Sequence, residues 1–376
     1  MKSRGKKSSK EKSKEKNSEI EHNYERRKAM LDIIRSNKSI KIIFSFLNEK
    51  IKYKIILYNK ACQKRLNISI ENVKNYLITE IEIIPKENTP GKFINFQKND
   101  KKYIHIFFND KKDNIKKNTI GKNESVRKIR IELDFFFNNF IGLFFGCTVA
   151  EKINFVKFNR KDIKSMKTMF SGCTSLKQLK IENLITDNVQ EMNEMFYDCG
   201  SLGEIDLKNF NTSKVTQMAN MFSNCVSLKK IDLSNFKFNK IKKIDGMFSG
   251  CTSTKKIILP KTEEIIIFNL SSMFEDCISL ENLDFCGLRL TGVINTSNMF
   301  FRCKSLVKLD LSNIEGTQLE NLDCMFYGCS SLEELNISSL KMMKDGNSEN
   351  MFYGCDNLKI LICNDNSIFY QYQFIN

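Results

Sequence analysis

Cysteine is the residue whose type and spacing first point to chemistry in this chain of 376 residues. Nine of the thirteen cysteines follow one another at a constant 26-residue interval: Cys147, Cys173, Cys199, Cys225, Cys251, Cys277, Cys303, Cys329 and Cys355. If neighbouring units lie at strand spacing, equivalent Cα atoms fall inside the distance window of a disulfide bond. Nine is an odd number, however, and a reducing compartment keeps thiols free. We therefore favour reduced, buried core cysteines and keep disulfide pairing as the alternative.

Metal binding and catalysis find little support in the other reactive residues. The chain has no C-x-x-C pair and contains two histidines, His22 and His105, so we do not expect a zinc site. Neither histidine lies near a serine or cysteine motif that could form a triad, and the common phosphate-loop and metalloprotease motifs are missing. Glu333 and Glu334 are adjacent, so on a strand they point to opposite faces. We predict a protein that is not an enzyme and needs no cofactor or metal.

The 26-residue interval indicates stacked structural units that bury their apolar faces against one another. In the unit at residues 215–236, apolar residues recur at steps of three and four: Val215, Met218, Met221, Phe222 and Cys225. This spacing predicts a short helix or 3₁₀ turn. Leu228, Ile231 and Leu233 then follow as L-x-x-L-x-L, which ends with the alternation of a strand. We expect parallel strands of successive units to form one sheet, with helical turns on the opposite face.

Sibling units repeat the same pattern, as in MFSGCTSLKQLKI, MFYDCGSLGEIDL, MFEDCISLENLDF, MFFRCKSLVKLDL and MFYGCSSLEELNI. The motif MF-x-x-C-x-SL-x-x-(L/I)-x-L, with N-F-N-T-S-K-V-T-Q-M following, resembles the BspA-type leucine-rich-repeat family over residues 126–363. The resemblance implies an α+β leucine-rich-repeat solenoid and a role in binding protein, since that family is known for surface proteins that bind host or matrix proteins. Val126, Ile129 and Ile131 predict an extra, atypical first unit, and we expect atypical units to cap both ends of a solenoid that spans residues 126–376.

The candidate binding residues flank the central apolar position of each predicted strand, where they face the open side of the sheet. Neighbouring aspartates such as Asp206 and Asp232 disfavour each other by roughly a few tenths of a kcal/mol. Nearby lysines, solvent screening or a basic partner would offset that repulsion. We predict that Asp232, Asp284 and Asp310 contribute to a partner footprint, with screening as the alternative. The full set of candidate contact residues is Lys180, Asp206, Lys230, Asp232, Lys256, Asp284, Lys308 and Asp310.

A helical module is predicted at residues 28–84, because residues 28–68 contain two apolar runs that suit two or three short helices. The order IIFSFL, then a helix ending YNKACQKRL, resembles an F-box, whose helices dock on the adaptor subunit of a cullin-RING ubiquitin ligase. That resemblance implies a substrate receptor, and it implies docking through Ile43, Phe44, Phe46 and Leu47. The alternative is a helical cap on the solenoid. Residues 85–125, rich in Lys and Asn, predict a linker with one strand at 103–108.

Net charge differs between the part of the chain before the repeats and the repeats themselves. Residues 1–142 hold 34 Lys and Arg against 17 Asp and Glu, whereas residues 143–376 hold 26 against 27, so the net charge of +16 comes from the first part. Residues 1–27 predict a disordered basic tail without the apolar run of a secretory signal, and no later segment predicts a transmembrane helix. We expect a monomeric protein of the cytoplasm or nucleus that binds protein and no specific nucleic acid. A surface or secreted adhesin is the alternative.

Overall fold

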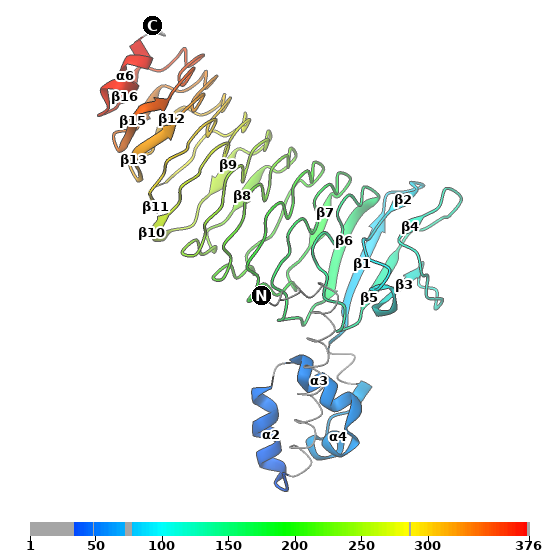
Figure 1. Cartoon of the computed structure of the whole chain (residues 1–376). Coiled ribbons are helices and arrows are strands. Elements are labelled where there is room, and N and C mark those ends of the chain that lie inside the picture. Colours follow the sequence, from blue (N-terminus) through cyan, green and yellow to red (C-terminus); the bar gives the residue numbers. More distant parts are fainter. Residues whose placement is uncertain (1–33, 48, 72–76, 286, 374–376) are drawn as a thin grey trace, which may run out of the picture. The chain divides into compact units, whose positions relative to one another are not determined.

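The computed structural model describes residues 34–47, 49–71, 77–285 and 287–373. It divides the chain into two compact units, Met1–Ile78 and Thr79–Asn376 (Figure 1). The first unit is helical, and the second carries the repeats. The basic tail predicted for residues 1–27 lies outside the described residues.

The described part of the first unit contains three short helices, α2 (Asn37–Phe46), α3 (Glu49–Tyr58) and α4 (Lys60–Leu66). Side chains at two helix starts accept hydrogen bonds from backbone N–H groups of the first turn: Ser36 from Ser39 and Asn59 from Cys62. The apolar sides of the helices form one small core of Ile40, Phe44, Ile55, Ile56, Cys62 and Leu66. The helices expected within residues 28–68 are therefore present.

The second unit begins with a sheet that is mostly antiparallel. Its strands are β1 (Thr79–Pro85), β3 (Ile104–Phe108), β5 (Ile129–Leu133), β6 (Ala150–Lys157) and β7 (Gln178–Lys180), in the order β3-β5-β1-β6-β7. β1 falls in the segment that we predicted as the end of the helical module, so the boundary at residue 84 differs from the structural one at 78. The reason is the period of two in this segment, which buries Ile81 and Ile83 on one face of a strand.

Residues 85–125 differ from the predicted linker because they contribute to the core of the second unit. β3 corresponds to the strand expected at 103–108, and β2 (Gly91–Lys92) pairs antiparallel with β4 (Thr119–Ile120). Phe93, Ile94 and Ile120 are buried beside them. The predicted extra repeat around Ile129 and Ile131 is instead β5, which runs antiparallel to β1 and β3. These strands shield the first coil of the array.

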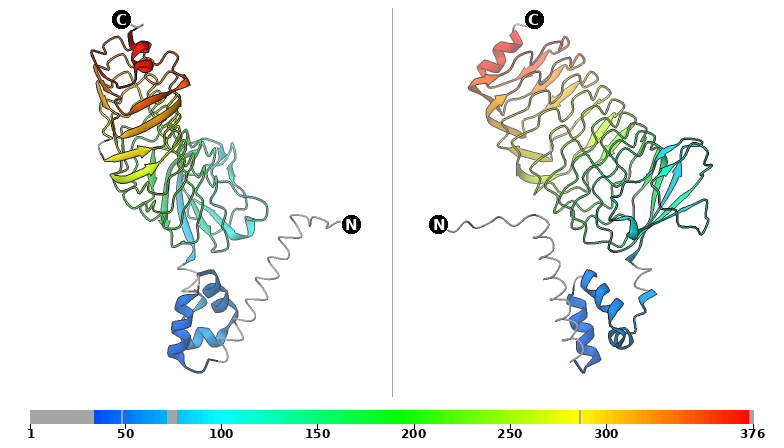
Figure 2. Two further views of the ribbon diagram at one scale, coloured as in Figure 1. Left: turned by 60° about the vertical axis from the view of Figure 1, so that its left-hand side comes forward. Right: turned by 45° about the vertical axis from the view of Figure 1, so that its right-hand side comes forward.

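The leucine-rich-repeat solenoid predicted from the periodic sequence is confirmed, and its coils stack along one axis (Figures 1 and 2). The face that we call the strand face carries β6, β7 and five further short strands. They are β8 (Lys230–Asp232), β9 (Lys256–Ile258), β12 (Lys308–Asp310), β14 (Glu334–Asn336) and β16 (Ile360–Ile362). Neighbouring strands pair in parallel through equivalent positions of successive repeats, as Leu309 with Leu335 shows.

The opposite part of each coil consists of consecutive β-turns rather than the expected short helix. The N–H groups of Met169, Ser171 and Cys173 donate to carbonyls three residues earlier, at 3.1–3.2 Å. The N–H groups between them donate to the next coil, as Phe170 does to Met195 at 2.9 Å. A helix cannot form here because two residues in each coil have left-handed backbone, such as Gly172 with φ 72°. Backbone hydrogen bonds therefore join neighbouring coils on this face, as they join the strands of a sheet.

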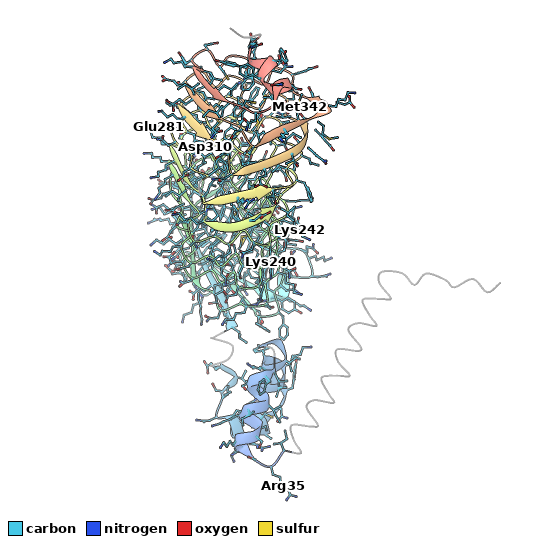
Figure 3. The ribbon with its side chains drawn as sticks, turned by 90° about the vertical axis from the view of Figure 1, so that its left-hand side faces the viewer. Arg35, Lys240, Lys242, Glu281, Asp310 and Met342 are labelled. Atoms are coloured by element: carbon cyan, nitrogen blue, oxygen red, sulfur yellow. The ribbon has the colours of Figure 1, made fainter. Side chains whose placement is uncertain are left out.

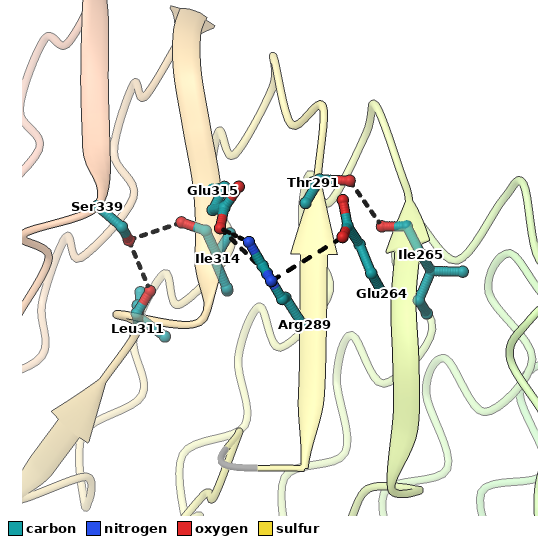
Figure 4. Close-up of polar contacts among 8 residues, drawn as sticks. All are labelled: Glu264, Ile265, Arg289, Thr291, Leu311, Ile314, Glu315 and Ser339. Carbon is teal, nitrogen blue, oxygen red and sulfur yellow. Dashed lines mark hydrogen bonds and ion pairs between the residues drawn. The ribbon is translucent and has the colours of Figure 1, made fainter.

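A second parallel sheet, absent from our predictions, lines the later coils. It contains β10 (Thr262–Ile266), β11 (Leu288–Thr291), β13 (Ile314–Asn321) and β15 (Leu340–Asn347), in that order. Arg289 joins three of its strands, because its Nη2 donates to Glu315 Oε1 at 2.5 Å and its Nη1 lies 4.0 Å from Glu264 Oε2 (Figure 4). The final helix, α6 (Asn366–Gln373), lies at the end of the array.

The core contains a stack of nine phenylalanine rings, one from each coil between Phe144 and Phe352. Neighbouring centroids lie 5.3–6.0 Å apart, with interplanar angles of 2–16°. All nine rings are fully buried. Such offset, parallel stacking is a favourable arrangement of aromatic rings in addition to their burial.

The periodic cysteines are free thiols that hydrogen-bond between coils. From Cys173 to Cys355, each Sγ donates to the carbonyl of the phenylalanine 29 residues earlier, at 3.1–3.2 Å. Burial raises the pKa of the Cys173 thiol to about 12, so it stays protonated and able to donate. The structure thus agrees with reduced core cysteines and gives them a second role in addition to filling space.

Candidate protein-binding face

The strand face carries the eight residues predicted to contact a partner, in two rows beside buried central residues. Leu179, Ile231, Ile257 and Leu309 point into the core, as the alternation of a strand requires. All eight candidates lie on the outer side, where Asp232 is half-buried and the other seven are exposed. Figure 3 shows Glu281 and Asp310 along one side of the second unit, away from Lys240, Lys242 and Met342.

The aspartates in these rows have structural partners within their own coil. The carboxylates of Asp206, Asp232 and Asp310 each accept a hydrogen bond from the backbone N–H two residues later, at 2.8–3.1 Å. Such bonds stabilise the turn that ends each strand. They explain why aspartate recurs at this position without requiring a binding partner.

Hydrogen bonds lower the pKa of these carboxyl groups. For Asp206 the Lys208 side chain is the main cause, and for Asp310 it is the Ser312 N–H. Partial burial opposes the shift at Asp232, where bonds from Ser234 and Lys230 outweigh it and the pKa is again lowered.

Lysines offset the repulsion expected between neighbouring carboxylates. Lys230 Nζ lies 3.0 Å from Asp232 Oδ2 on the same strand. Lys308 Nζ lies 2.7 Å from Glu334 Oε1 on the next strand. The rows are therefore close to electrically balanced over much of the strand face.

These bonds predict an acid-sensitive contribution to stability. A carboxylate with a lowered pKa in the folded state stabilises the fold above its ordinary pKa, and this contribution is lost as the pH falls through the lowered value. The free energy of unfolding of the native chain should therefore fall between about pH 5 and pH 2, and changing both Asp232 and Asp310 to Asn should make this fall smaller, by under about 1 kcal/mol for each carboxylate. Urea unfolding followed by circular dichroism at several pH values measures this. An unchanged pH profile would contradict the assignment.

Two shallow depressions interrupt the strand face where the strands part. The first, of about 470 Å³, includes Lys180 and Asp206 in its lining. It coincides with residues 204–206, which form no strand next to β7. The second, of about 500 Å³, includes Lys256, Asp284 and Lys308. It lies where residues 282–284 make one isolated bridge, from Asn282 to Lys256. Five of the eight candidates thus border the two depressions.

The second depression includes residues that our sequence interpretation missed. The half-buried Ile258 adds apolar surface next to the buried Pro260, and Lys261 adds a positive charge. Gly287 keeps this part open, because a Cβ atom there would lie 2.6 Å from Lys261 Cγ in the preceding coil. A signal for this site was present in the sequence: Ile258 is apolar in a row that is otherwise mostly charged, and a proline follows two residues later.

The four residues that the F-box resemblance assigned to docking differ in how far they are buried. Phe44 is buried in the core of the helical module, and Leu47 is half-buried against it. The assignment of Phe44 is therefore corrected, because its side chain packs against its own helices. Ile43 and Phe46 are 40% and 86% exposed, and Ile42 lies beside them at 51%. An apolar surface on α2 thus remains, but it is composed of different residues.

Two other kinds of feature, a metal-binding cluster and a membrane-spanning helix, are absent from the part of the chain that the structure describes. Within residues 34–47, 49–71, 77–285 and 287–373, no three His, Cys, Asp or Glu side chains are placed to hold a metal ion. None of the helices over these same residues has the length and apolar character needed to cross a membrane.

Comparisons with known proteins find one family model and solved structures that match parts of this chain. Residues 138–262 and 268–366 match the model of a family described as "Mycoplasma protein of unknown function, DUF285". A leucine-rich-repeat protein of T. pallidum is 18% identical over 46% of this chain and 80% of its own, with a TM-score of 0.29. A leucine-rich cell surface protein of Faecalibacterium prausnitzii is also 18% identical, over 63% of this chain and 78% of its own, with a TM-score of 0.23. No curated protein sequence matches the chain.

Proposed function

Because the chain belongs to the DUF285 family, whose repeats are of the BspA-like type, we propose that it is a non-enzymatic scaffold that binds another protein through its strand face. The observation that carries this proposal is the second depression, at the strands around Lys256 and Lys308. A flat surface with balanced charges binds a partner weakly. A concave apolar site with a few charges can bury a side chain of the partner and so contribute more to affinity.

The chemistry of the second depression defines the segment that it would bind. Ile258 supplies apolar surface next to the buried Pro260. Among the described lining residues, Lys256, Lys261 and Lys308 supply positive charge and Asp284 supplies one carboxylate. Lys308 is partly compensated by Glu334. We infer that the partner inserts an apolar side chain that is flanked by acidic residues. Charge of this kind mainly sets specificity and association rate, and the buried apolar side chain supplies more of the affinity.

Site-specific photo-crosslinking tests the proposal in the full chain. Replacing Asn282, at the edge of this depression, with p-benzoylphenylalanine should give discrete adducts with one protein. Adding Lys256→Glu and Lys308→Glu should reduce those adducts at least about tenfold, since the charges would then repel acidic residues. The control has the same photoreactive residue at Lys240, which lies away from the strand face (Figure 3), and should give no such adduct. Equal crosslinking from both positions would reject the strand face as the binding surface.

A second candidate function rests on the exposed apolar surface of α2. We propose that Ile42, Ile43 and Phe46 dock on another protein, which the F-box resemblance identifies as an adaptor of a cullin-RING ubiquitin ligase. Large exposed apolar side chains grouped on one helix are typical of a helix that docks in a groove. Phe46→Asp in the full chain should abolish co-purification of such an adaptor from the native cytosol. Co-purification that survives this change, or that never occurs, would remove this candidate.

The strand face would serve equally well in an adhesin at the cell surface. Treatment of intact cells with a protease distinguishes the two locations, because only a surface protein would be cleaved. We propose the cytoplasm or nucleus, on the basis of the basic first part of the sequence, and cleavage of the protein on intact cells would overturn this.

A further inference from the structure

Exposed apolar side chains gather in the last described coil, at residues 351–373. In the inner coils the two rows of the strand face hold mainly charged and amide residues, such as Lys308 and Asp310. On β16 the same two positions are Ile360 and Ile362, which are 50% and 51% exposed. Further large, exposed side chains lie nearby in the sequence of this coil and α6: Tyr353, Phe369 and Tyr370.

β16 also presents an open sheet edge. It pairs in parallel with β14, and no other described strand pairs with it. Ile360 N–H donates to Glu333, and Ile362 C=O accepts from Ile337, so both residues direct their backbone groups toward β14. Successive residues of a strand alternate in this direction, so the N–H and C=O of Leu361 point away from β14. An apolar edge of this kind is a template for pairing with another chain.

The helix α6 covers the core of the last coil. Ile368 is fully buried, the Tyr372 hydroxyl donates to Leu358 C=O at 2.8 Å, and the Tyr372 ring meets Phe352 edge-to-face. These contacts seal the end of the phenylalanine stack. Ile360 and Ile362 remain half-exposed beside these contacts, and β16 contains neither lysine nor proline, two of the residues that block an edge strand.

We propose that a second copy of this chain covers β16, through an antiparallel pairing of the two β16 strands about a two-fold axis. The argument for a second copy is charge: residues 351–373 contain three charged side chains, Asp356, Lys359 and Asp365, so two identical ends meet with little repulsion. The pairing is also self-complementary. Leu361 lies opposite its own counterpart and exchanges two hydrogen bonds with it, and Ile360 lies opposite Ile362 of the second copy. The two sheets become one sheet of six strands.

Measurement of mass in solution tests the dimer with the full chain. Light scattering after size exclusion, at concentrations from about 1 μM to about 100 μM, should show the mass rising from 43.8 kDa toward twice that value. Ile360→Lys together with Ile362→Lys should keep the chain monomeric, because lysines then lie opposite lysines. The matched control, Ile266→Lys with Phe268→Lys, changes two similarly exposed side chains near β10 and should leave the dimer intact.

A charge-swapped variant tests the antiparallel register. It also shows whether the double-lysine variant loses the dimer through charge repulsion or through misfolding. In Ile360→Lys with Ile362→Glu, each lysine lies opposite a glutamate of the second copy, so the dimer should return at least about tenfold more strongly than in the double-lysine variant. In a parallel pairing, like charges would meet and no recovery would occur. A monomeric wild-type chain over the whole range, as the sequence alone led us to expect, would overturn the proposal. Equal dimerisation of all variants would also overturn it.

Discussion

Replacing Phe222 with alanine is expected to lower the free energy of unfolding by about 3–5 kcal/mol. Phe222 is fully buried near the middle of the ring stack, with Phe196 at 5.4 Å and Phe248 at 6.0 Å. Its carbonyl also accepts the thiol of Cys251 from the next coil. Truncation leaves a cavity that neighbouring coils cannot close, because their own rings fix the spacing. Urea unfolding followed by circular dichroism measures the loss.

Phe301→Ala is the matched control for this prediction. Phe301 also stacks on an aromatic ring of the next coil, Tyr327, at 4.9 Å, but it is only half-buried. We expect a loss well below that of Phe222→Ala, because water reaches the site and no closed cavity forms. Equal losses from the two variants would mean that aromatic stacking itself, and not burial in the core, supplies the stability.

Removing the carboxylate of Asp162 is the second change with a large expected effect. Its partner, Arg160, has no exposed surface, and the two side chains form a two-bonded pair at 2.8 Å and 2.9 Å. Arg160 also donates to Phe137 C=O at 2.6 Å and lies against the ring of Phe135. Asp162→Ala leaves a buried guanidinium without its counter-charge, and should cost about 2–4 kcal/mol, toward the lower end because Asp162 is 41% exposed.

Asp206→Ala serves as the control for the effect at Asp162. It also removes an aspartate from an ion pair, but its partner Lys208 is exposed. Because water solvates a free lysine, we expect a much smaller loss than for Asp162→Ala. The comparison uses the same urea unfolding measurement. If the two losses were similar, burial of Arg160 would not be the source of the effect.

The outward-facing residues of the strand face could be predicted from sequence because they depend on local alternation. Residues on either side of Leu179 or Leu309 must point away from the core once these leucines point inward, and the structure places them so. The two depressions could not be predicted in this way. They depend on whether equivalent strands of neighbouring coils pair or separate, and thus on contacts such as that between Gly287 and Lys261.

The expected helical turns show where periodic spacing misleads. Met218, Met221, Phe222 and Cys225 have the spacing of a helix, but their side chains reach the core from consecutive β-turns. The backbone alternates between bonds within a coil and bonds to the next coil, and left-handed residues such as Asn220 and Asn224 make this alternation regular. A spacing of three and four residues shows which side chains face the core. Both a helix and a series of consecutive β-turns produce this spacing.

The sequence by itself determined the repeat and the inward-facing residues of each coil, because these properties recur in every repeat and depend on near neighbours. Only the tertiary structure decided how the first coil is covered, where a second sheet begins and where the strand face opens. Those features depend on pairings between distant segments, such as β1 with β6. The periodic cysteines belong to both groups. Their spacing predicted a core position, whereas the thiol bond from Cys251 to the Phe222 carbonyl became visible only once neighbouring coils were stacked.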